Sequence, residues 1–317
     1  MGEIDLKNIK LETGGQSGGT PSAVCPPHFG TAQAGPPQDR LDAGLSKLTQ
    51  PDYIDIFEIK KNLKGPLMAK NIYYEEKVDS TNTLARELSV KGAKNGSVVI
   101  SDCQEKGRGR NGKIWTSPCG CNIYMSIILK PKFSPEVAQG MTILAAVSVA
   151  DAIAEITPLK PQIKWPNDIL IDSKKVSGIL TEMSTQNMII EHIIVGIGIN
   201  VNLEEKNTED SIKDIATSLL IESKKIKGPA SPINRNKLII SILNKFDRYY
   251  EMFLSTGLSS VLKYYQEYFV MIGKEIEINV KDKRVRGLVV GIDSKGALLL
   301  KTGENELERV VSGEICL

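Results

Sequence analysis

Residues 97–115, SVVISDCQEKGRGRNGKIW, join a strand-like run to a loop rich in glycine and basic side chains. The first eight residues are apolar and β-branched enough to predict a strand. In the loop, Arg108 and Arg110 are separated by Gly109 and flanked by two further glycines. Guanidinium groups and bare backbone N–H groups in this arrangement can hold one anion, and the missing side chains let a ligand approach closely. A solvated basic turn is the alternative interpretation of this loop alone.

The composition indicates a folded chain with no general attraction to anions. Of the 317 residues, 41% are hydrophobic and 25% are charged, as is typical of globular domains. The 40 basic and 38 acidic residues give a formal net charge of +2, so any anion site has to be local. The five cysteines are sparse and lack a zinc spacing, and we find no leader-like segment or apolar run of membrane length. We therefore expect a reduced, cytoplasmic protein with no membrane association.

Strand-like runs alternate with amphipathic helices along the chain on both sides of the loop. Strands are predicted over residues 71–78 and 121–130, and helices over 135–156 and about 235–255. After residue 270 the pattern changes to short strands separated by turns. This order predicts an α+β protein, in which a layered sheet domain is followed by a small barrel.

A second polar stretch, IKWPND (163–168), lies at the end of a predicted strand. Side chains alternate along a strand, so Lys164 points away from Ile163 and Trp165 and can face a cleft. Pro166 fits only at an edge, a bulge or a strand end. A lysine there can hold a carboxylate against a phosphate and stabilise charge that develops during phosphoryl or nucleotidyl transfer. An exposed surface lysine is the alternative, and Trp165 is expected to be a core residue.

Small polar side chains occur at a third position, VDSTNTLA (78–85). The stretch places Ser80, Thr81 and Asn82 at a junction between a strand and a helix. Hydroxyl and amide groups there can hydrogen-bond a polar ligand. Helix capping explains Ser80 equally well.

Spaced glycines mark a fourth stretch, VGIGINVN (195–202). It contains Gly196, Gly198 and Asn200, but it lacks the third glycine and the following helix of a dinucleotide fingerprint. A strand whose small residues lie near a bound ligand is the interpretation left open.

In this order and spacing, the stretches closely resemble the biotin protein ligases, also called biotin–acetyl-CoA-carboxylase ligases. The resemblance covers roughly residues 70–317, and GRGR together with KWPND is highly specific. The matching segments are DSTN (79–82), Gln104, GRGRNGKIW (107–115), KWPND (164–168), SGIL (177–180), GIGINVN (196–202) and GIDSKGALLL (291–300). A lipoate ligase or octanoyl transferase with the same sheet is an alternative, although GRGRNG with KWPND favours biotin.

The resemblance implies a two-step ligase reaction. The carboxylate of biotin attacks the α-phosphate of ATP, with Mg²⁺, to give biotinyl-5′-AMP and pyrophosphate. A lysine of a biotin carboxyl carrier protein then attacks the mixed anhydride and releases AMP. ATP and biotin are thus the implied substrates, and no metal site built from protein side chains is expected.

The resemblance also assigns roles to individual residues. The implied biotin-binding positions are Ser80, Thr81, Asn82, Gln104, Arg108, Gly109, Arg110 and Lys164. The implied positions for ATP and the adenylate are Arg108, Arg110, Trp115, Lys164 and Asn200. Lys164 and Arg110 are the catalytic candidates, because two anionic reactants need fixed positive charge to meet. We expect the glycine-rich loop to close as a lid over the adenylate, with help from Trp115.

The fold implied by the resemblance is a mixed-sheet catalytic domain of the biotin/lipoate ligase type with a C-terminal SH3-like β-barrel. The expected regions are an N-terminal region (1–65), the catalytic biotin/ATP-binding domain (66–269) and the SH3-like domain (270–317). Members that also repress transcription begin with a winged helix-turn-helix, but residues 11–44 here hold seven glycines and five prolines. We therefore expect that module to be degenerate or missing, which makes DNA binding doubtful. A bifunctional ligase and biotin-operon repressor is the alternative, and a homodimer is left open.

Two cysteines in CGCN (119–122) depart from the pattern. No other cysteine or histidine completes a metal site around them in the sequence. We expect Cys119 and Cys121 to be two small buried thiols without a metal or redox role.

Overall fold

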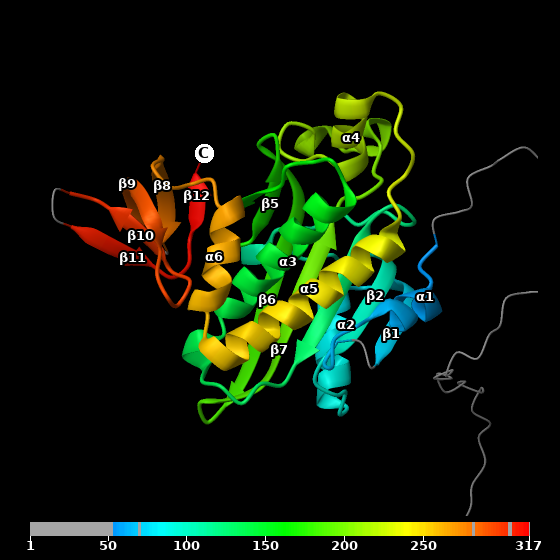
Figure 1. Cartoon of the computed structure of the whole chain (residues 1–317), viewed down its shortest axis with the longest axis horizontal. Helices are drawn as coiled ribbons and strands as arrows, with labels where there is room; N and C mark the ends of the chain where they lie inside the picture. The colour runs from blue at the N-terminus through cyan, green and yellow to red at the C-terminus, as the bar shows by residue number, and fades with distance from the viewer. Residues whose placement is uncertain (1–52, 69–70, 281–282, 304–305, 317) are drawn as a thin grey trace, which may run out of the picture. The chain divides into compact units, whose positions relative to one another are not determined.

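A seven-stranded mixed sheet forms the larger of two sheets (Figure 1). The computed structural model describes residues 53–68, 71–280, 283–303 and 306–316. The strand order is β1-β2-β3-β7-β6-β5-β4, with β1 parallel to β2 and the other neighbours antiparallel. The strands are β1 (Ile72–Val78), β2 (Ser97–Gln104), β3 (Ile123–Leu129), β4 (Gln162–Lys164), β5 (Asp168–Ile171), β6 (Lys174–Gln186) and β7 (Ile189–Ile199).

Residues 1–52 lie outside the described part of the chain, so the expected degenerate N-terminal module stays a prediction. The first described helix is α1 (Ile56–Asn62). Its N-cap is Asp55, whose carboxylate accepts hydrogen bonds from the backbone N–H groups of Phe57 and Glu58.

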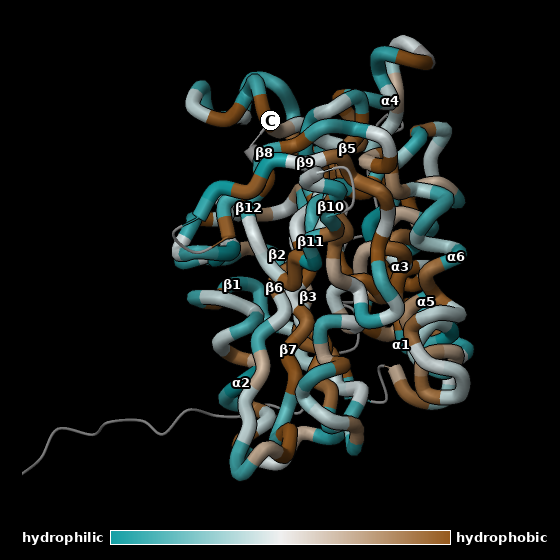
Figure 2. Tube along the Cα trace, turned by 90° about the vertical axis from the view of Figure 1, so that its left-hand side faces the viewer, coloured by the Kyte–Doolittle hydropathy of each residue, from teal (hydrophilic) through white to brown (hydrophobic). Residues whose placement is uncertain are grey.

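Helices cover both faces of the sheet. The helices α3 (Gly140–Ile156), α5 (Arg235–Thr256) and α6 (Ser259–Tyr268) lie over one face, and α2 (Thr81–Val90) packs on β2, β3 and β7. Side chains alternate between these two layers, because Ile127 belongs to the large core and its neighbour Ile128 to the smaller cluster under α2. All seven residues of β3 are therefore buried. Figure 2 shows the hydrophobic colour along β3 and β7.

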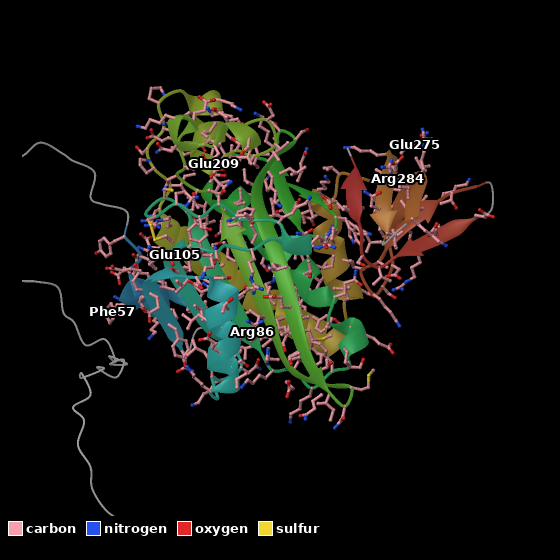
Figure 3. The ribbon with its side chains drawn as sticks, turned by 180° about the vertical axis from the view of Figure 1, so that it is seen from behind. Phe57, Arg86, Glu105, Glu209, Glu275 and Arg284 are labelled. Carbon is pink, nitrogen blue, oxygen red and sulfur yellow. A yellow bond between two sulfur atoms is a disulfide. The ribbon has the colours of Figure 1, made fainter. Side chains whose placement is uncertain are left out.

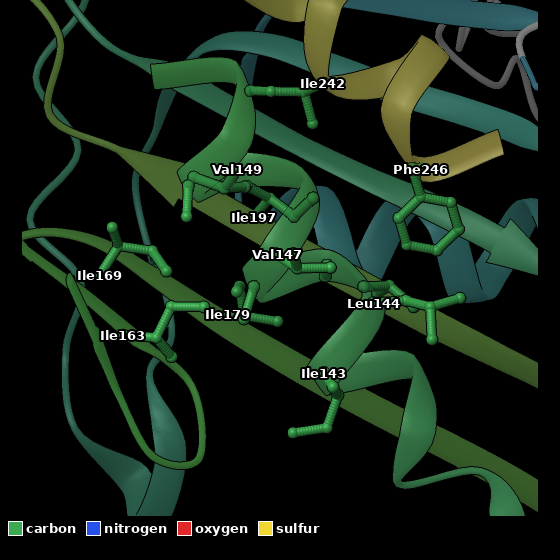
Figure 4. Close-up of a cluster of buried hydrophobic side chains, with 14 of the residues drawn as sticks. Ile143, Leu144, Val147, Val149, Ile163, Ile169, Ile179, Ile197, Ile242 and Phe246 are labelled. Atoms are coloured by element: carbon green, nitrogen blue, oxygen red, sulfur yellow. The ribbon is translucent and has the colours of Figure 1, made fainter. Parts of the chain in front are cut away.

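Helix α3 is the centre of the larger core. Figure 4 shows its Ile143 and Val147 side chains between sheet isoleucines and the Ile242 and Phe246 side chains of α5. Contrary to the expectation from the sequence, the stretch Pro135–Ile156 is long and apolar enough to cross a membrane, but 72% of its apolar 18-residue window is buried within the fold. Its hydrophobicity is thus accounted for by packing.

The prediction of one continuous helix over 135–156 was wrong at its start. A short 3₁₀ turn, Pro135–Val137, precedes α3, and the Ser134 side chain makes no capping hydrogen bond. Gly140 is the first residue of α3, where an added Cβ would lie 3.1 Å from the Phe253 ring. The first residue of α3 is thus packed closely against α5.

The C-terminal part of the chain is a five-stranded antiparallel sheet of order β11-β10-β9-β8-β12. Its strands are β8 (Glu275–Val280), β9 (Lys283–Ile292), β10 (Leu298–Lys301), β11 (Leu307–Val310) and β12 (Glu314–Cys316). The Trp165 side chain, 1% exposed, donates a hydrogen bond from Nε1 to the Gly296 carbonyl, 3.0 Å away. The α+β prediction with a C-terminal β module, and a core position for Trp165, are confirmed.

Candidate functional site

One cavity of about 710 Å³ opens among the ends of the strands and the segments that follow them. It brings together every side chain for which the sequence suggested a role in binding or catalysis. The predicted residues that line it are Ser80, Thr81, Asn82, Gln104, Arg108, Gly109, Arg110, Trp115, Lys164 and Asn200. Segments separated by more than a hundred residues therefore share one binding space.

Gln104, the last residue of β2, links the start of α2 to the far side of the basic loop. Its Oε1 accepts hydrogen bonds from the backbone N–H and the hydroxyl of Thr81, at 2.9 and 3.2 Å. Its Nε2 donates to the Ser117 hydroxyl at 2.9 Å. Ser80 is the N-cap of α2, yet its side chain makes no capping hydrogen bond. Capping therefore does not explain Ser80, whose side chain lines the cavity.

Asn82 is held by three hydrogen bonds at the floor of the cavity. Its Nδ2 donates to the Leu180 carbonyl at 3.2 Å and to the Glu182 carboxylate at 2.7 Å. Its Oδ1 accepts from the Ser126 hydroxyl at 2.7 Å, and that hydroxyl lies 2.8 Å from the Thr81 hydroxyl. Sequence reasoning missed Ser126 and Glu182, because only strand pairing brings β3 and β6 beside the start of α2.

The spaced glycines make room for two large side chains. An added Cβ on Gly196 would lie 2.1 Å from the Asn82 side chain, and one on Gly198 would lie 2.7 Å from the Trp115 indole. Gly178 of β6 pairs directly with Gly198 and faces the same indole. The strands β6 and β7 thus form a flat floor without Cβ atoms on which Trp115 lies.

Two contacts hold the basic loop, one to β6 and one to the turn between β4 and β5. Arg108 forms an ion pair with Glu182 at 3.0 Å, and Arg110 donates a hydrogen bond to Asn167 Oδ1 at 3.0 Å. The tip turns through Asn111 and Gly112, which both have positive φ angles. The loop is therefore an ordered structure whose two arginines point toward the cavity walls.

Lys164 is a half-buried cation at the end of β4. Its Nζ lies 3.4 Å from the Ile315 carbonyl. Burial lowers the pKa of Lys164, and the nearby carboxylate of Asp168 opposes that shift. Asp168 is itself paired with Lys175 at 2.7 Å, and the Lys175 Nζ lies 5.3 Å from the centre of a Trp115 ring.

The pKa of Arg110 is subject to the same two opposing effects as the pKa of Lys164. Burial lowers the pKa of its guanidinium group, while the carboxylates of Asp168 and Glu314 act in the opposite direction. Two cations therefore face one cavity with Asp168 close to both. An anionic ligand is the complement that such a site favours.

The C-terminal module contributes to the cavity wall. Gly313, Glu314 and Ile315 line the cavity, and Glu314 forms an ion pair with Lys113 of the basic loop. That pairing, ahead of the other influences, lowers the pKa of the Glu314 carboxyl. Sequence reasoning missed these residues, since nothing in the local pattern connects position 314 to position 113.

Asn200 also lines the cavity and directly follows β7. Its Nδ2 donates to the Thr217 carbonyl at 3.0 Å, and 7% of the residue is exposed. Its backbone N–H donates to the Val176 carbonyl at 2.8 Å. Asn200 therefore joins the end of β7 to the segment before α4 (Leu219–Lys227).

The expectation of two buried thiols at Cys119 and Cys121 was wrong for both residues, since Cys121 is only partly buried. Cys119 is exposed and forms a disulfide with Cys103, with the two Cα atoms 4.4 Å apart. The pairing also departs from the expected fully reduced protein. The disulfide forms because the basic loop folds back on itself. Its last residues come to lie beside the end of β2, which brings together two cysteines 16 positions apart.

Two family models match the chain. The first is described as the biotin/lipoate A/B protein ligase family and matches residues 74–200. The second is described as the biotin protein ligase C terminal domain and matches residues 271–317. Together they extend over both sheets.

Named relatives and solved structures agree with these matches. The bifunctional ligase/repressor BirA of Bacillus subtilis (strain 168) is 35% identical over 272 residues, covering 86% of this chain and 82% of that protein. The biotin--[acetyl-CoA-carboxylase] ligase of Paracoccus denitrificans is 27% identical, covering 71% and 92%. A structure of the biotin protein ligase from Aquifex aeolicus in complex with biotin and ATP has a TM-score of 0.66 and 31% identity, covering 78% and 98%.

The glycine floor can be tested with Gly198→Ala. The added methyl group occupies the place of the Trp115 indole, so we expect the ring to lift away from β7 and become more accessible to solvent. Acrylamide quenching of tryptophan fluorescence measures this change, because the only other tryptophan, Trp165, is 1% exposed. The Stern–Volmer constant should rise about twofold, and Ile197→Val on the same strand should leave it unchanged. Equal quenching in Gly198→Ala and the native chain would contradict this packing.

Proposed function

The chain belongs to the biotin protein ligase family, and we propose that it uses ATP to join biotin to a lysine of a biotin carboxyl carrier protein. The observation that carries this proposal is the convergence of Lys164, Arg110 and the Ser80–Thr81–Gln104 cluster on one cavity. The family model covers biotin and lipoate enzymes alike, but the relatives described above are named for biotin or its ligase activity.

In the first step, the carboxylate of biotin attacks the α-phosphate of ATP and pyrophosphate leaves. Both reactants are anions, so their approach in water is opposed by repulsion. We propose that Lys164 and Arg110 reduce this repulsion, because both are partly buried cations beside Asp168. Fixed charges in a site of reduced water content stabilise the crowded transition state without reorganising.

We assign the polar cluster at the start of α2 to the biotin side of the cavity. The hydroxyl and amide groups of Ser80, Thr81 and Gln104 can exchange hydrogen bonds with the polar ring of biotin. Asn82 supports this wall through its bonds to Glu182 and Ser126. Its side-chain N–H groups already have protein acceptors, which favours a positioning role for Asn82.

We assign the nucleotide to the side bounded by Trp115 and Asn200, with the Arg108 and Arg110 side chains above the phosphates. The magnesium ion enters as part of the nucleotide substrate, coordinated by the phosphates. In the second step the carrier lysine attacks the mixed anhydride and AMP leaves. Until then, the loop that contains Gly109 has to keep water from the anhydride.

We place this reaction in the cytoplasm, where ATP and the acceptor protein meet. Repression of a biotin operon is the alternative role, and the relative from Bacillus subtilis carries the name of a ligase and repressor. We propose that DNA binding is weak or lost, because the Gly/Pro-rich stretch 11–44 has no helical period. Specific, salt-sensitive retention of a biotin-operon fragment in the presence of biotin and ATP would refute that proposal.

Transfer of labelled biotin to a carrier domain tests the enzymatic proposal. We expect Lys164→Ala and Arg110→Ala each to lower kcat/KM for transfer by about 10²- to 10³-fold, because each removes a charge that faces the reacting groups. Circular dichroism should show an intact fold in both variants.

Lys174→Ala is the matched control, since Lys174 extends from β6 to the Lys213 carbonyl away from the two cations. Its activity should stay within about twofold of the native enzyme. Native-like transfer by Lys164→Ala, or no transfer by the native chain, would contradict the proposal.

The lowered pKa of Lys164 predicts a pH limit for adenylate formation. The protonated amine is the active form, so the rate should fall as pH rises through the lowered pKa, which is below that of an ordinary lysine. Pyrophosphate release, measured from neutral pH to about pH 10, follows this fall in rate. The carrier protein is left out of the assay, so titration of its lysine does not contribute. In Lys164→Arg the side chain stays charged, so the remaining activity should lose the alkaline decline. An identical decline in both proteins would rule out Lys164 as its source.

A further inference from the structure

We propose that Cys103 and Cys119 form a reversible thiol-modification site, oxidised by small disulfides such as oxidised glutathione, and that its cross-link stiffens the biotin-binding end of the cavity. The proposed modification depends only on the two cysteines. Its effect on biotin rests on the proposed function. No part of the ligase reaction uses either sulfur atom.

The two cysteines mark the two ends of the basic loop. Cys103 directly precedes Gln104 at the end of β2, and Cys119 directly follows Pro118 on the returning segment. Their Cα separation of 4.4 Å is within the range that disulfides span without backbone movement. Figure 3 shows the yellow disulfide close to Glu105.

The two sulfur atoms differ in access. Cys119 is exposed, whereas Cys103 is 7% exposed. A small disulfide or a reducing thiol in solution can therefore reach Cys119 first. The Cys103 Sγ lies 3.4 Å from the Glu76 carbonyl, so the thiol formed on reduction has an acceptor within reach. Exposed disulfides are the readily reduced ones.

The oxidation proceeds through two exchanges. The Cys119 thiolate attacks one sulfur of oxidised glutathione, which breaks its S–S bond and releases one glutathione thiolate. The Cys103 thiolate then attacks the Cys119 sulfur of the mixed disulfide and releases the second glutathione. The protein loses two electrons and two protons, and the two released glutathione molecules take them up. Excess thiol reverses both exchanges.

The cross-link acts on the hydrogen bonds at the base of the loop. The Gln104 backbone N–H donates to the Ser117 carbonyl at 3.4 Å, and Gln104 Nε2 donates to the Ser117 hydroxyl at 2.9 Å. These bonds join the same two segments that the disulfide joins. With the disulfide closed, Gln104 keeps its place against Thr81 before a ligand arrives. Such preorganisation strengthens binding by removing an ordering step.

Peptide mapping of the full chain tests the modification. Trypsin cleaves after Lys106 and Lys113, so the two cysteines fall on separate peptides unless a disulfide joins them. After treatment with oxidised glutathione we expect the peptides containing Cys103 and Cys119 to be joined, and excess dithiothreitol should separate them. If Cys119 carries only glutathione while Cys103 remains open to alkylation, the proposal is wrong.

Calorimetry with biotin alone tests the functional consequence. We expect the oxidised protein to bind biotin about fivefold more tightly than the reduced protein. Cys119→Ser should bind like the reduced protein under both conditions, and Cys121→Ser should keep the redox response. Biotin affinities within twofold of each other in the two states, with the cross-link formed, would overturn the proposed effect. If the cross-link forms but neither state binds biotin, the proposed function fails and the modification site stands.

Discussion

The site depends on two partly buried cations, Lys164 and Arg110, that both lie near the carboxylates of Asp168 and Glu314. Burial lowers the pKa of both Lys164 and Arg110, and Asp168 counters that effect for each of them. Asp168 is also paired with Lys175, and Glu314 with Lys113, so these four cations outnumber the two carboxylates. Such a cavity is costly when no ligand is bound and favours an anion, which is the condition for bringing two anionic substrates together.

The sheet provides the space in which this charge can act. Gly178 and Gly198 face each other across β6 and β7, and the Trp115 indole lies on the surface without Cβ atoms that they create. Two positions further along the pairing of β6 with β7, Gly196 makes the equivalent room for Asn82. The glycine spacing therefore serves the packing of these two side chains. The missing Cβ atoms leave space above β6 and β7, and the Trp115 indole and the Asn82 amide occupy it.

The sequence predicted what depends on local chain geometry. Strand alternation separated Lys164 from the buried Trp165, and the glycines around Arg108 and Arg110 marked a loop that lines the cavity. The sequence did not predict contacts that depend on how distant segments pack together. Examples are the hydrogen bond from Asn82 to Glu182 and the ion pair of Glu314 with Lys113. The disulfide was missed for the same reason, because separation along the chain does not tell which way a loop returns.

The structure also changes the physical picture of the loop as a lid. A disordered loop would have to regain its ordering entropy from contacts with the ligand. Here Arg108, Arg110 and Lys113 already bind Glu182, Asn167 and Glu314 respectively. We therefore expect an anionic substrate to compete with these protein acceptors for the loop's basic side chains, so that closure of the loop exchanges one set of partners for another. Such an exchange costs less entropy than ordering a disordered loop would.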